Sequence, residues 1–372
     1  MKLAVPKETY PGETRVAATP ESVKKLKGLG LDVVIQSGAG VHARFSDADY
    51  LAAGASIAPD ARTALEGADV VFKVRGPKGA ETALFKKGAV LAALLAPYTE
   101  QDAIRALAEQ GVAAFAMEFL PRISRAQAMD VLSSQANLAG YKAVVDAAAQ
   151  LGRAMPMMMT AAGTIAPARV LVMGAGVAGL QAIATARRLG AIVSATDVRP
   201  ATKEQVESLG ATFVAVMDEE FRNAQTAGGY AREMSGEYQA KQAALIAETV
   251  RKQDIVITTA LIPGRRAPVL VSEAMIRTMK PGSVIVDLAA EAGGNTPLTR
   301  PDEVVEVQGV TIMGYSNLPG RLAIDSSALY ARNLFSFISL IVDKKTGALA
   351  IDWDDEIIKG ALVTKDGATL WK

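Results

Sequence analysis

The stretch that decides the fold is Ala168-Arg-Val-Leu-Val-Met-Gly174-Ala-Gly176-Val-Ala-Gly179-Leu180, where a short apolar run leads into the spacing G-x-G-x-x-G. The run is typical of a buried parallel strand, and Val177–Leu189 after it has the pattern of a helix. In that context the first glycine permits a tight turn, the second lets a pyrophosphate approach the backbone, and the third lets the helix pack closely on the strand. Free N–H groups at the start of the helix bind phosphate. The stretch therefore predicts dinucleotide binding.

Two charged residues after the next predicted strand bear on which dinucleotide is bound. Asp197 follows the strand 191–196, where its carboxylate would accept hydrogen bonds from the adenosine ribose and repel a 2′-phosphate. Arg199 is a counter-signal, because an arginine at this place can hold a 2′-phosphate; the alternative is a surface arginine beside the adenine. The acid in its expected place predicts a preference for NAD over NADP.

The rest of the chain alternates the same two patterns. Amphipathic stretches that predict helices lie at 20–29, 47–53, 61–66 and 99–110. Apolar runs that predict parallel strands lie at 2–6, 32–37, 69–74, 89–95, 112–119, 168–173, 191–196, 212–216, 254–260, 283–288 and 310–315. Alternation of strands and helices predicts right-handed crossovers and doubly wound sheets.

The predicted fold is α/β, with two Rossmann-like doubly wound parallel-sheet domains. We expect an NAD(H)-binding domain at 136–315, inserted into a first domain formed by 1–135 and 316–372. Long helices at 124–152 and 326–342 are expected to make the two crossings, and a cofactor is expected in a cleft between the domains. The segment 217–240 has no clear element, which in a compact protein indicates a functional or disordered loop.

The composition excludes several classes of function. The 372 residues carry a formal net charge of +1, which argues against nucleic-acid binding. Without cysteine there are no disulfides, thiolate catalysis or cysteine metal sites, and the single histidine, His42, cannot build a histidine cluster, so no metal is predicted. The charged N-terminus is unlike a signal peptide, and the apolar runs are too short to span a bilayer. We expect a cytoplasmic protein whose membrane connection comes through partners.

Further motifs resemble one family, that of alanine dehydrogenase and the transhydrogenase α-subunit. They are the stretches Pro11–Pro20, Pro121–Gln127, Asn137–Tyr141, Thr258–Gly264 and Gly282–Ala289. The resemblance runs nearly end to end, and the segment Arg122-Ile-Ser-Arg-Ala-Gln127 is similar to the transhydrogenase branch in particular.

The resemblance implies a set of residues near the nicotinamide end of NAD(H). They are Arg122, Gln127, Asp130 and Ser133, with Ile123, Ser124 and Arg125 beside them. If 124–135 is helical, Gln127, Asp130 and Ser133 lie along one helix face and can hydrogen-bond the carboxamide and ribose hydroxyls. Without the resemblance, an ordinary helix N-terminus with a surface salt bridge explains these residues.

The resemblance also implies a loop that closes over NAD(H) and carries a tyrosine, here within Gly228-Gly229-Tyr230-Ala231. A disordered surface insert is the alternative for this stretch. The same matching adds contacts to NAD(H) from Val177, Asp197, Val198, Arg199, Gly229, Gln242 and Leu261, beside Gly174, Gly176 and Gly179 of the motif.

Two activities are compatible with the family. An alanine dehydrogenase-like amino-acid oxidoreductase needs a general acid/base; the family's catalytic histidine is replaced within Leu94–Pro97, and Glu291 matches its aspartate. Arg15 and Lys73 match that enzyme's substrate-binding cations; whether they are relics of such a site or structural charges stays open. Hydride transfer from NADH to NADP⁺ needs no such base.

Transfer between nicotinamides therefore fits the sequence better. Only one dinucleotide fingerprint is present, so a partner subunit would bring NADP(H). The resemblance implies the NAD(H)-binding subunit of a proton-translocating NAD(P) transhydrogenase, a homodimer held peripherally at the inner face of a membrane by membrane-spanning subunits. The run Met155–Met159 is expected to be an apolar wall or interdomain packing, and the apolar segment Leu334–Val342 to be buried between domains or subunits.

Overall fold

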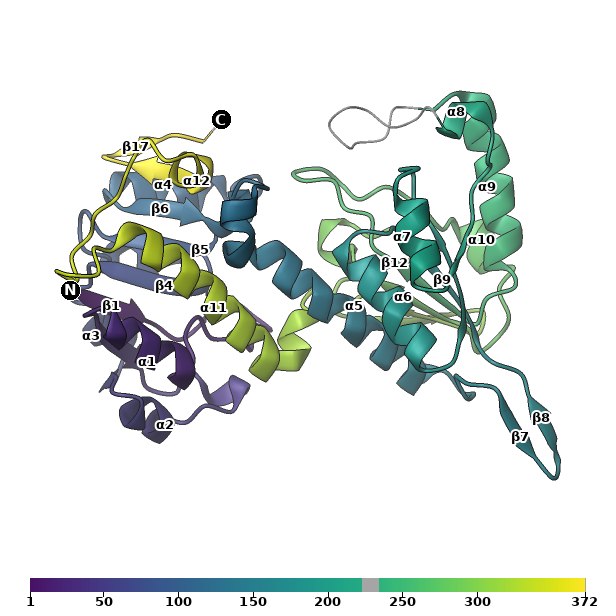
Figure 1. Ribbon diagram of the computed structural model, residues 1–372, viewed down its shortest axis with the longest axis horizontal. Coiled ribbons are helices and arrows are strands. Elements are labelled where there is room, and N and C mark those ends of the chain that lie inside the picture. The colour runs from purple at the N-terminus through teal and green to yellow at the C-terminus, as the bar shows by residue number, and fades with distance from the viewer. Residues whose placement is uncertain (223–233, 372) are drawn as a thin grey trace. The chain divides into compact units, whose positions relative to one another are not determined.

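The computed structural model describes residues 1–222 and 234–371, which fall into two compact units. Unit 1 comprises Met1–Gln135 and Pro319–Lys372, and unit 2 comprises Ala136–Leu318. Each is built on a mostly parallel sheet with helices on both faces (Figure 1). The predicted α/β class with two doubly wound sheets is therefore confirmed.

The sheet of unit 1 has the strand order β17-β16-β6-β5-β4-β1-β2-β3. Strands β1 to β6 are parallel, and the C-terminal hairpin pairs antiparallel with β6. Since parallel strands end at one edge, the segments after β1, β4, β5 and β6 gather there. The bounds are β1 (Lys2–Val5), β2 (Asp32–Gln36), β3 (Ser56–Ala58), β4 (Val70–Arg75), β5 (Val90–Leu94), β6 (Ala113–Ala116), β16 (Leu362–Lys365) and β17 (Ala368–Thr369).

Helices pack on both faces of this sheet. One core joins α1 (Pro20–Gly28), α2 (Asp47–Ala52), α11 (Ala323–Ile341) and α12 (Glu356–Ala361) to one face. The other joins α3 (Ala61–Leu65) and α4 (Gln101–Glu109) to the opposite face. Leu334, Phe337, Ile338, Ile341 and Val342 are buried in the first of these cores. The apolar segment 334–342 thus packs in the core of unit 1 with Phe335 and Leu340 partly exposed, and its expected burial between domains or subunits stays a prediction.

The sheet of unit 2 has the strand order β11-β10-β9-β12-β13-β15-β14, in which β14 alone of the described strands pairs antiparallel. The chain places β10 on one side of β9 and β12 on the other, which makes the carboxyl end of β9 a topological switch point. The bounds are β9 (Arg169–Met173), β10 (Ile192–Thr196), β11 (Thr212–Phe213), β12 (Ile255–Thr258), β13 (Val284–Asp287), β14 (Val304–Val307) and β15 (Val310–Met313).

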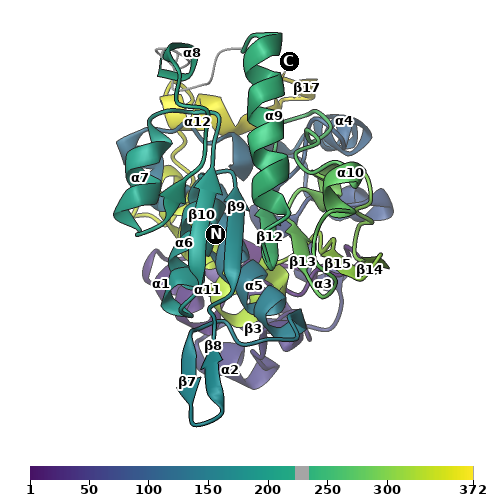
Figure 2. The same cartoon turned by 90° about the vertical axis from the view of Figure 1, so that its right-hand side faces the viewer.

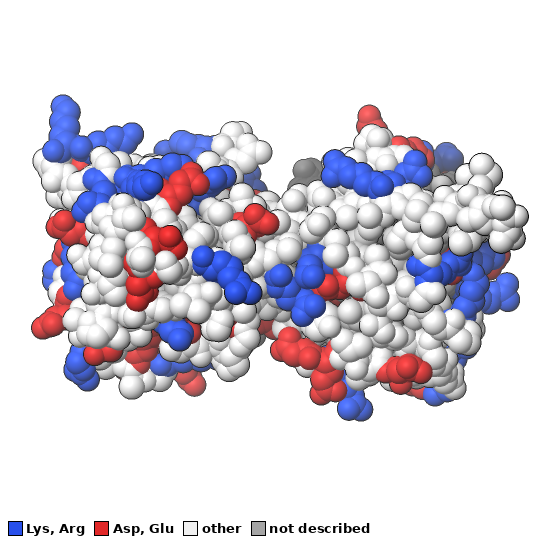
Figure 3. All heavy atoms as spheres, turned by 90° about the horizontal axis from the view of Figure 1, so that it is seen from below, with Lys and Arg blue, Asp and Glu red and all other residues white. Residues whose placement is uncertain are grey.

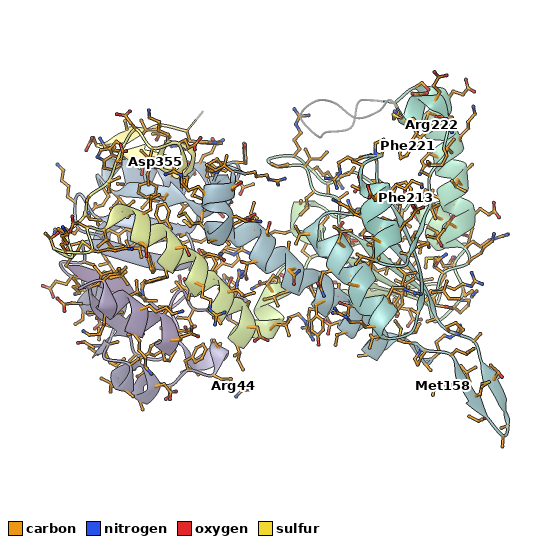
Figure 4. The ribbon with its side chains drawn as sticks, in the orientation of Figure 1. Arg44, Met158, Phe213, Phe221, Arg222 and Asp355 are labelled. Atoms are coloured by element: carbon orange, nitrogen blue, oxygen red, sulfur yellow. The ribbon has the colours of Figure 1, made fainter. Side chains whose placement is uncertain are left out.

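The helices of unit 2 also cover both faces. The long α5 (Val131–Gln150), which begins in unit 1, packs with α6 (Val177–Arg188) and α7 (Thr202–Ser208) on one face. On the other face lie α9 (Gly236–Val250) and α10 (Glu273–Ile276) (Figure 2). The short α8 (Glu219–Arg222) precedes α9 in the chain, and in Figure 4 Phe221 of α8 points toward Phe213.

A hairpin of unit 2 projects away from its sheet. It is formed by β7 (Met158–Thr160) and β8 (Gly163–Ile165), and Figure 4 labels Met158 on it. Met155 is buried, but 59% of Met157 and 78% of Met159 are exposed. Beyond Met155 the methionine run does not pack in the core of unit 2, because the chain leaves the core there, and the alternative of interdomain packing stays a prediction.

Two predictions about the long helices are wrong. The stretch 124–152 is interrupted, since a 3₁₀ turn spans Ser124–Met129 and α5 begins only at Val131. Asp130 ends the turn with extended backbone angles and caps α5. The chain passes from unit 2 to unit 1 at residues 318–319, ahead of α11, so the helix at 326–342 does not make the second crossing.

Candidate functional site

The glycine turn after β9 has the geometry that a dinucleotide fingerprint requires. Gly174 has φ 108°, a value that side chains disfavour, and a Cβ there would overlap Thr259 Oγ1. A Cβ on Gly179 would overlap the carbonyl oxygen of Gly174, so α6 can approach the strand only with glycine at this position. Both positions are therefore glycine because the turn and the helix packing demand it.

The N-terminus of α6 is open. Its N-cap residue is Gly176, which has no side chain to cap the helix, and no other atom lies within 4 Å of the place where a Cβ would lie. The first N–H groups of a helix have no partner inside the helix and carry the positive end of its dipole. This combination of open space and undersatisfied donors fits the diphosphate of a dinucleotide.

Helix α6 is also held closely from behind. Gly140 of α5 lies so near Ala178 that a Cβ on it would overlap the Ala178 carbonyl group. The amide of Asn137 donates to Gln181, one turn further along α6. The motif Asn137–Tyr141 thus supports the start of α6 within unit 2.

Asp197 follows β10 and lies beside the glycine turn. Its Oδ2 accepts the N–H of Ala175 at 2.7 Å, and the side chain of Arg199 pairs with both carboxylate oxygens at 2.9 Å. Burial raises the pKa of the Asp197 carboxyl, but the hydrogen bonds from Arg199 and Ala175 outweigh it and leave the pKa below its usual value. The carboxylate is therefore ionised and positioned at the turn.

The segment after β12 reaches the same edge of the sheet. Thr259 Oγ1 lies 3.3 Å from the Met173 carbonyl oxygen, and Asn295 bonds both the N–H and the carbonyl of Ala260. Asn295 is in turn fixed by Asp287, whose Oδ2 accepts the Asn295 N–H at 2.7 Å. The sequence motif Gly282–Ala289 contains β13 and Asp287, and Asn295 follows six residues later, but the motif did not indicate that these two side chains hold the segment after β12.

Exposed apolar side chains follow the ends of neighbouring strands in unit 2. Val177 follows β9, Val198 follows β10, and Leu261 follows β12, and between 42% and 66% of each is exposed. Gln242 of α9 accepts the N–H of Val216 at 2.9 Å and faces Thr196 at the end of β10. Of the residues predicted in unit 2, those that the structure describes thus lie at one edge, where the apolar surfaces suit the aromatic rings of a nucleotide.

The predicted nicotinamide-end residues lie in unit 1. Arg122 and Gln127 are exposed. Asp130 accepts the backbone N–H of Ser133 at 2.9 Å and its hydroxyl at 2.5 Å. The expectation that Gln127, Asp130 and Ser133 share one helix face is wrong, because Asp130 caps α5 and the preceding turn has 3₁₀ geometry.

Long-range contacts hold that turn in place. The side chain of Arg125 pairs with Asp355, the N-cap residue of α12, at 2.7 and 2.9 Å (Asp355 is labelled in Figure 4). Asn333 of α11 donates to the Ala128 carbonyl at 2.9 Å and accepts from Ser134 at 2.7 Å. Arg125 therefore has a structural partner within unit 1.

Arg15 is buried against a carboxylate of its own segment. Its Nε and Nη2 donate to the two oxygens of Glu13 at 2.7 Å each, and Nη1 donates to Gln135 at 2.8 Å. Burial raises the pKa of the Glu13 carboxyl, but the hydrogen bonds and charge of Arg15 outweigh it and lower the pKa. Every nitrogen of the guanidinium head is thus bonded inside unit 1.

Lys73 is paired in the same way. Its Nζ lies 2.7 Å from Glu81 and 3.7 Å from Glu8, and only 1% of its side chain is exposed. Burial raises the pKa of Glu8 in spite of the charge of Lys73. These contacts favour structural charges over a substrate site as the explanation of Arg15 and Lys73.

Glu118, after β6, lies at the same edge. It accepts the N–H groups of Leu95 and Ala96 at 2.9 and 2.6 Å, and its Oε2 is buried without a hydrogen-bond partner in the described structure. Burial raises the pKa of this carboxyl. The segment at Leu94–Pro97, where the family's dehydrogenases would carry a histidine, thus faces a carboxylate.

The described structure also bears on membrane-spanning helices and metal sites, neither of which the sequence predicts. In residues 1–222 and 234–371, no helix is long and apolar enough to cross a membrane, and no group of three or more His, Cys, Asp or Glu side chains could hold a metal ion. On the face drawn in Figure 3, Lys and Arg are interspersed with Asp and Glu. The predicted loop residues Gly229 and Tyr230 lie outside the described residues.

Comparisons with known proteins identify close relatives. The family model described as the N-terminal domain of alanine dehydrogenase/PNT matches residues 4–139, and its C-terminal counterpart matches 143–372. An NAD(P) transhydrogenase alpha-subunit protein of Rhodospirillum rubrum is 57% identical, over 99% of this chain and 97% of its own length. A crystal structure of a transhydrogenase from Sinorhizobium meliloti is 54% identical with a TM-score of 0.91, covering both chains entirely. A structure of L-alanine dehydrogenase is 27% identical with a TM-score of 0.81, covering 100% of this chain and 97% of its own.

Proposed function

The chain belongs to the alanine dehydrogenase/PNT family, and on that basis we propose that it is the NAD(H)-binding subunit of a proton-translocating NAD(P) transhydrogenase. Its reaction would be direct hydride transfer between NADH and NADP⁺ held by a partner subunit. The observation that carries the proposal is the open N-terminus of α6 beside an ionised Asp197, where a dinucleotide fits.

The residues of unit 2 would bind and orient the adenosine and diphosphate. Gly176 gives room for the diphosphate against the first N–H groups of α6, and Asp197 would accept from the ribose hydroxyls. The nicotinamide supplies the hydride. The exposed surfaces of Val177 and Leu261 would exclude water from the bound rings.

For unit 1 we propose the role that the sequence predicted. Arg122, Gln127, Asp130 and Ser133 would contact the nicotinamide end, since all are at least partly exposed and offer a cation, an amide, a carboxylate and a hydroxyl. Ile123, Ser124 and Arg125 would lie beside them, and Tyr230 with Gly229 would contribute the covering loop. The remaining proposed contacts are Gly174, Gly179, Val198, Arg199 and Gln242.

The alanine dehydrogenase-like alternative has less support. The chain's single histidine, His42, is exposed in a 3₁₀ turn, and Arg15 and Lys73 are bound to carboxylates within unit 1. A reductive amination moves protons as well as a hydride and so requires a general acid/base. Transfer between two nicotinamides requires only two rings at a distance of about 3–3.5 Å in a dry site.

The proposal includes partners. We propose that the chain is a homodimer, that residues 136–315 are its NAD(H)-binding domain, inserted between 1–135 and 316–372, and that membrane-spanning subunits hold it at the inner face of the membrane. The homodimer is supported by the hairpin β7–β8. An isolated two-stranded hairpin is only marginally stable in water, and Met157, Met159 and Ile165 on and beside this hairpin are exposed, so a second copy of the chain would cover them. Sedimentation that gives a monomer at micromolar concentration would contradict the homodimer.

The decisive test mixes the pure chain with an NADP(H)-binding transhydrogenase component. We expect saturable hydride transfer from NADH to a spectrally distinct NADP⁺ analogue in the mixture and little in either protein alone. Transfer of deuterium from deuterated NADH to the analogue, without loss to water, would establish that it is direct. The control is oxidation of NADH by the chain alone with pyruvate and ammonia; rapid turnover there would favour the amino-acid dehydrogenase.

A further inference from the structure

The guanidinium of Arg199 occupies the part of Asp197 that a ribose would need. Arg199 Nε donates to Oδ1 and Nη2 donates to Oδ2, each at 2.9 Å. The backbone N–H groups of Arg199 and Ala175 donate to the same two oxygens at 2.8 and 2.7 Å. A carboxylate offers about four lone-pair positions, so these four donors fill it.

Of the four donors, the two in the guanidinium are the ones that can leave. The N–H of Ala175 is fixed by the glycine turn, and the backbone at Arg199 is fixed because its carbonyl accepts the hydroxyl of Thr202 at 2.7 Å. The side chain of Arg199 is 36% exposed, whereas that of Asp197 is 6% exposed. Withdrawal of the guanidinium would free one lone-pair position on each carboxylate oxygen of Asp197. The two hydroxyls of a ribose diol require two such positions.

The same side chain is suited to a 2′-phosphate. A guanidinium binds phosphate through two parallel N–H donors, and a carboxylate alone repels it. Arg199 is tethered two residues beyond Asp197, so a displaced guanidinium stays close to the 2′ position of a ribose bound there. Arg199 therefore lies beside the adenosine ribose of either nucleotide: it competes with the ribose diol of NADH for Asp197, and it is suited to bind the 2′-phosphate of NADPH.

We propose that Arg199 is the residue that limits how strongly unit 2 discriminates NADH from NADPH. It competes with the ribose diol for Asp197 and, when displaced, binds the 2′-phosphate. This inference rests on the proposed function, because it assumes that the glycine turn of unit 2 binds the dinucleotide.

The test compares dissociation constants for NADH and NADPH, which differ only in the 2′-phosphate, in the full chain. We expect Arg199→Ala to bind NADH about threefold more tightly and NADPH about tenfold more weakly, since a charge-assisted pair to phosphate is lost. Arg199→Lys keeps the cation but not the bidentate geometry, and its ratio should lie between those of the wild type and Arg199→Ala. The matched control is Lys203→Ala, which removes a nearby cation that pairs with Glu207 and should leave the ratio unchanged.

The outcomes separate this inference from the proposed function. If the wild type binds neither nucleotide, the proposed function fails. If the wild type binds NADH but Arg199→Ala weakens NADH and NADPH equally, or leaves NADPH unaffected, the inference is overturned while the proposed function stands. The inference is supported if Arg199→Ala has a larger ratio of the NADPH to the NADH dissociation constant than the wild type and the same unfolding transition.

Discussion

The carboxyl edges of the two sheets differ in what they leave available. In unit 2 the edge presents backbone N–H groups at the start of α6, an open space at Gly176 and exposed apolar side chains. In unit 1 the corresponding edge holds Arg15 and Lys73, each bound to carboxylates of the same unit. The two sheets share one architecture, but the edge of unit 2 leaves backbone N–H groups open to a ligand, whereas the edge of unit 1 binds its cations Arg15 and Lys73 internally.

The largest expected effect concerns the edge of unit 1, which we call the closed edge because Arg15 and Lys73 are bound internally there. Arg15→Leu would remove the guanidinium that pairs with the fully buried Glu13 carboxylate and leave it with the backbone N–H groups of Thr14 and residue 15 and with Arg75 Nε at 3.5 Å. Breaking a buried pair in this way costs about 3–5 kcal/mol of unfolding free energy. Urea unfolding of both proteins measures the difference.

A double variant and a surface variant control that result. Glu13→Gln together with Arg15→Leu removes the stranded charge and should recover part of the loss. Lys25→Leu removes one partner of an exposed pair with Glu21 and should change stability by less than about 0.5 kcal/mol. Equal stability of Arg15→Leu and the wild type would mean that the closed edge is not held by this pair.

An intermediate effect is expected at the open edge, which is the edge of unit 2 at the start of α6. Gly176→Ala adds a Cβ into empty space at an allowed φ of −79°, so the fold should be unchanged. The same Cβ would obstruct the diphosphate and weaken NADH binding about tenfold, or about 1.4 kcal/mol. Isothermal titration measures the affinity, and thermal unfolding checks the fold.

Gly179→Ala is the matched contrast. Its Cβ would overlap the Gly174 carbonyl oxygen, so it should lower both the stability of the protein and its affinity for NADH. If Gly176→Ala bound NADH with the affinity of the wild type, the diphosphate would not lie against the start of α6, and the contrast between the two edges would be wrong.

The smallest expected effect is a pH dependence in unit 1. Burial raises the pKa of Glu118, so the unfolded chain releases this proton at lower pH than the folded one. The charged carboxyl therefore lowers the free energy of unfolding more and more as the pH rises. The change begins near about pH 4.3, the pKa of this group in the unfolded chain, and continues through its higher pKa in the folded protein. Glu118→Gln removes that dependence.

The unfolding free energy of Glu118→Gln relative to the wild type should therefore rise between pH 4 and pH 7, as the Glu118 carboxyl of the wild type loses its proton. Glu109→Gln, at an exposed position on α4, is the control and should show no such trend. A difference that shrinks with rising pH would mean that Arg75 and the backbone donors, which lower the pKa, outweigh burial.

The fold was largely predictable because its signals are local. The glycine turn at 174–179 is fixed by neighbouring atoms, and the buried strands are continuous apolar runs. The start of α5 at Val131 was missed although Asp130 and Ser133 form a capping pair, since the turn before it is held by Asn333 and Asp355, some 200 residues away. The hairpin β7–β8 was missed because exposed methionines have the same pattern as buried ones.

The site was predictable to a lesser extent. Spacing alone placed Gly174, Gly176, Gly179 and Asp197 around one turn, and the structure describes that turn. No pattern in the sequence indicated that Arg199 covers Asp197 or that Glu13 binds Arg15, because side-chain pairing depends on rotamers. The roles of Arg122, Gln127, Asp130 and Ser133 stay predictions.

The C-terminal hairpin and α11 also affect how the chain can be made. Strand β16 pairs with β6, and Tyr330 and Phe337 of α11 lie in the core that covers β1, β2 and β4. A ribosome therefore releases all of unit 2 before the segments that complete unit 1 emerge. During that interval the first 135 residues have an uncovered apolar face and an unpaired strand edge, which are sites of aggregation. Slow translation between residues 136 and 318 should thus lower the yield of folded protein more than slow translation after residue 340.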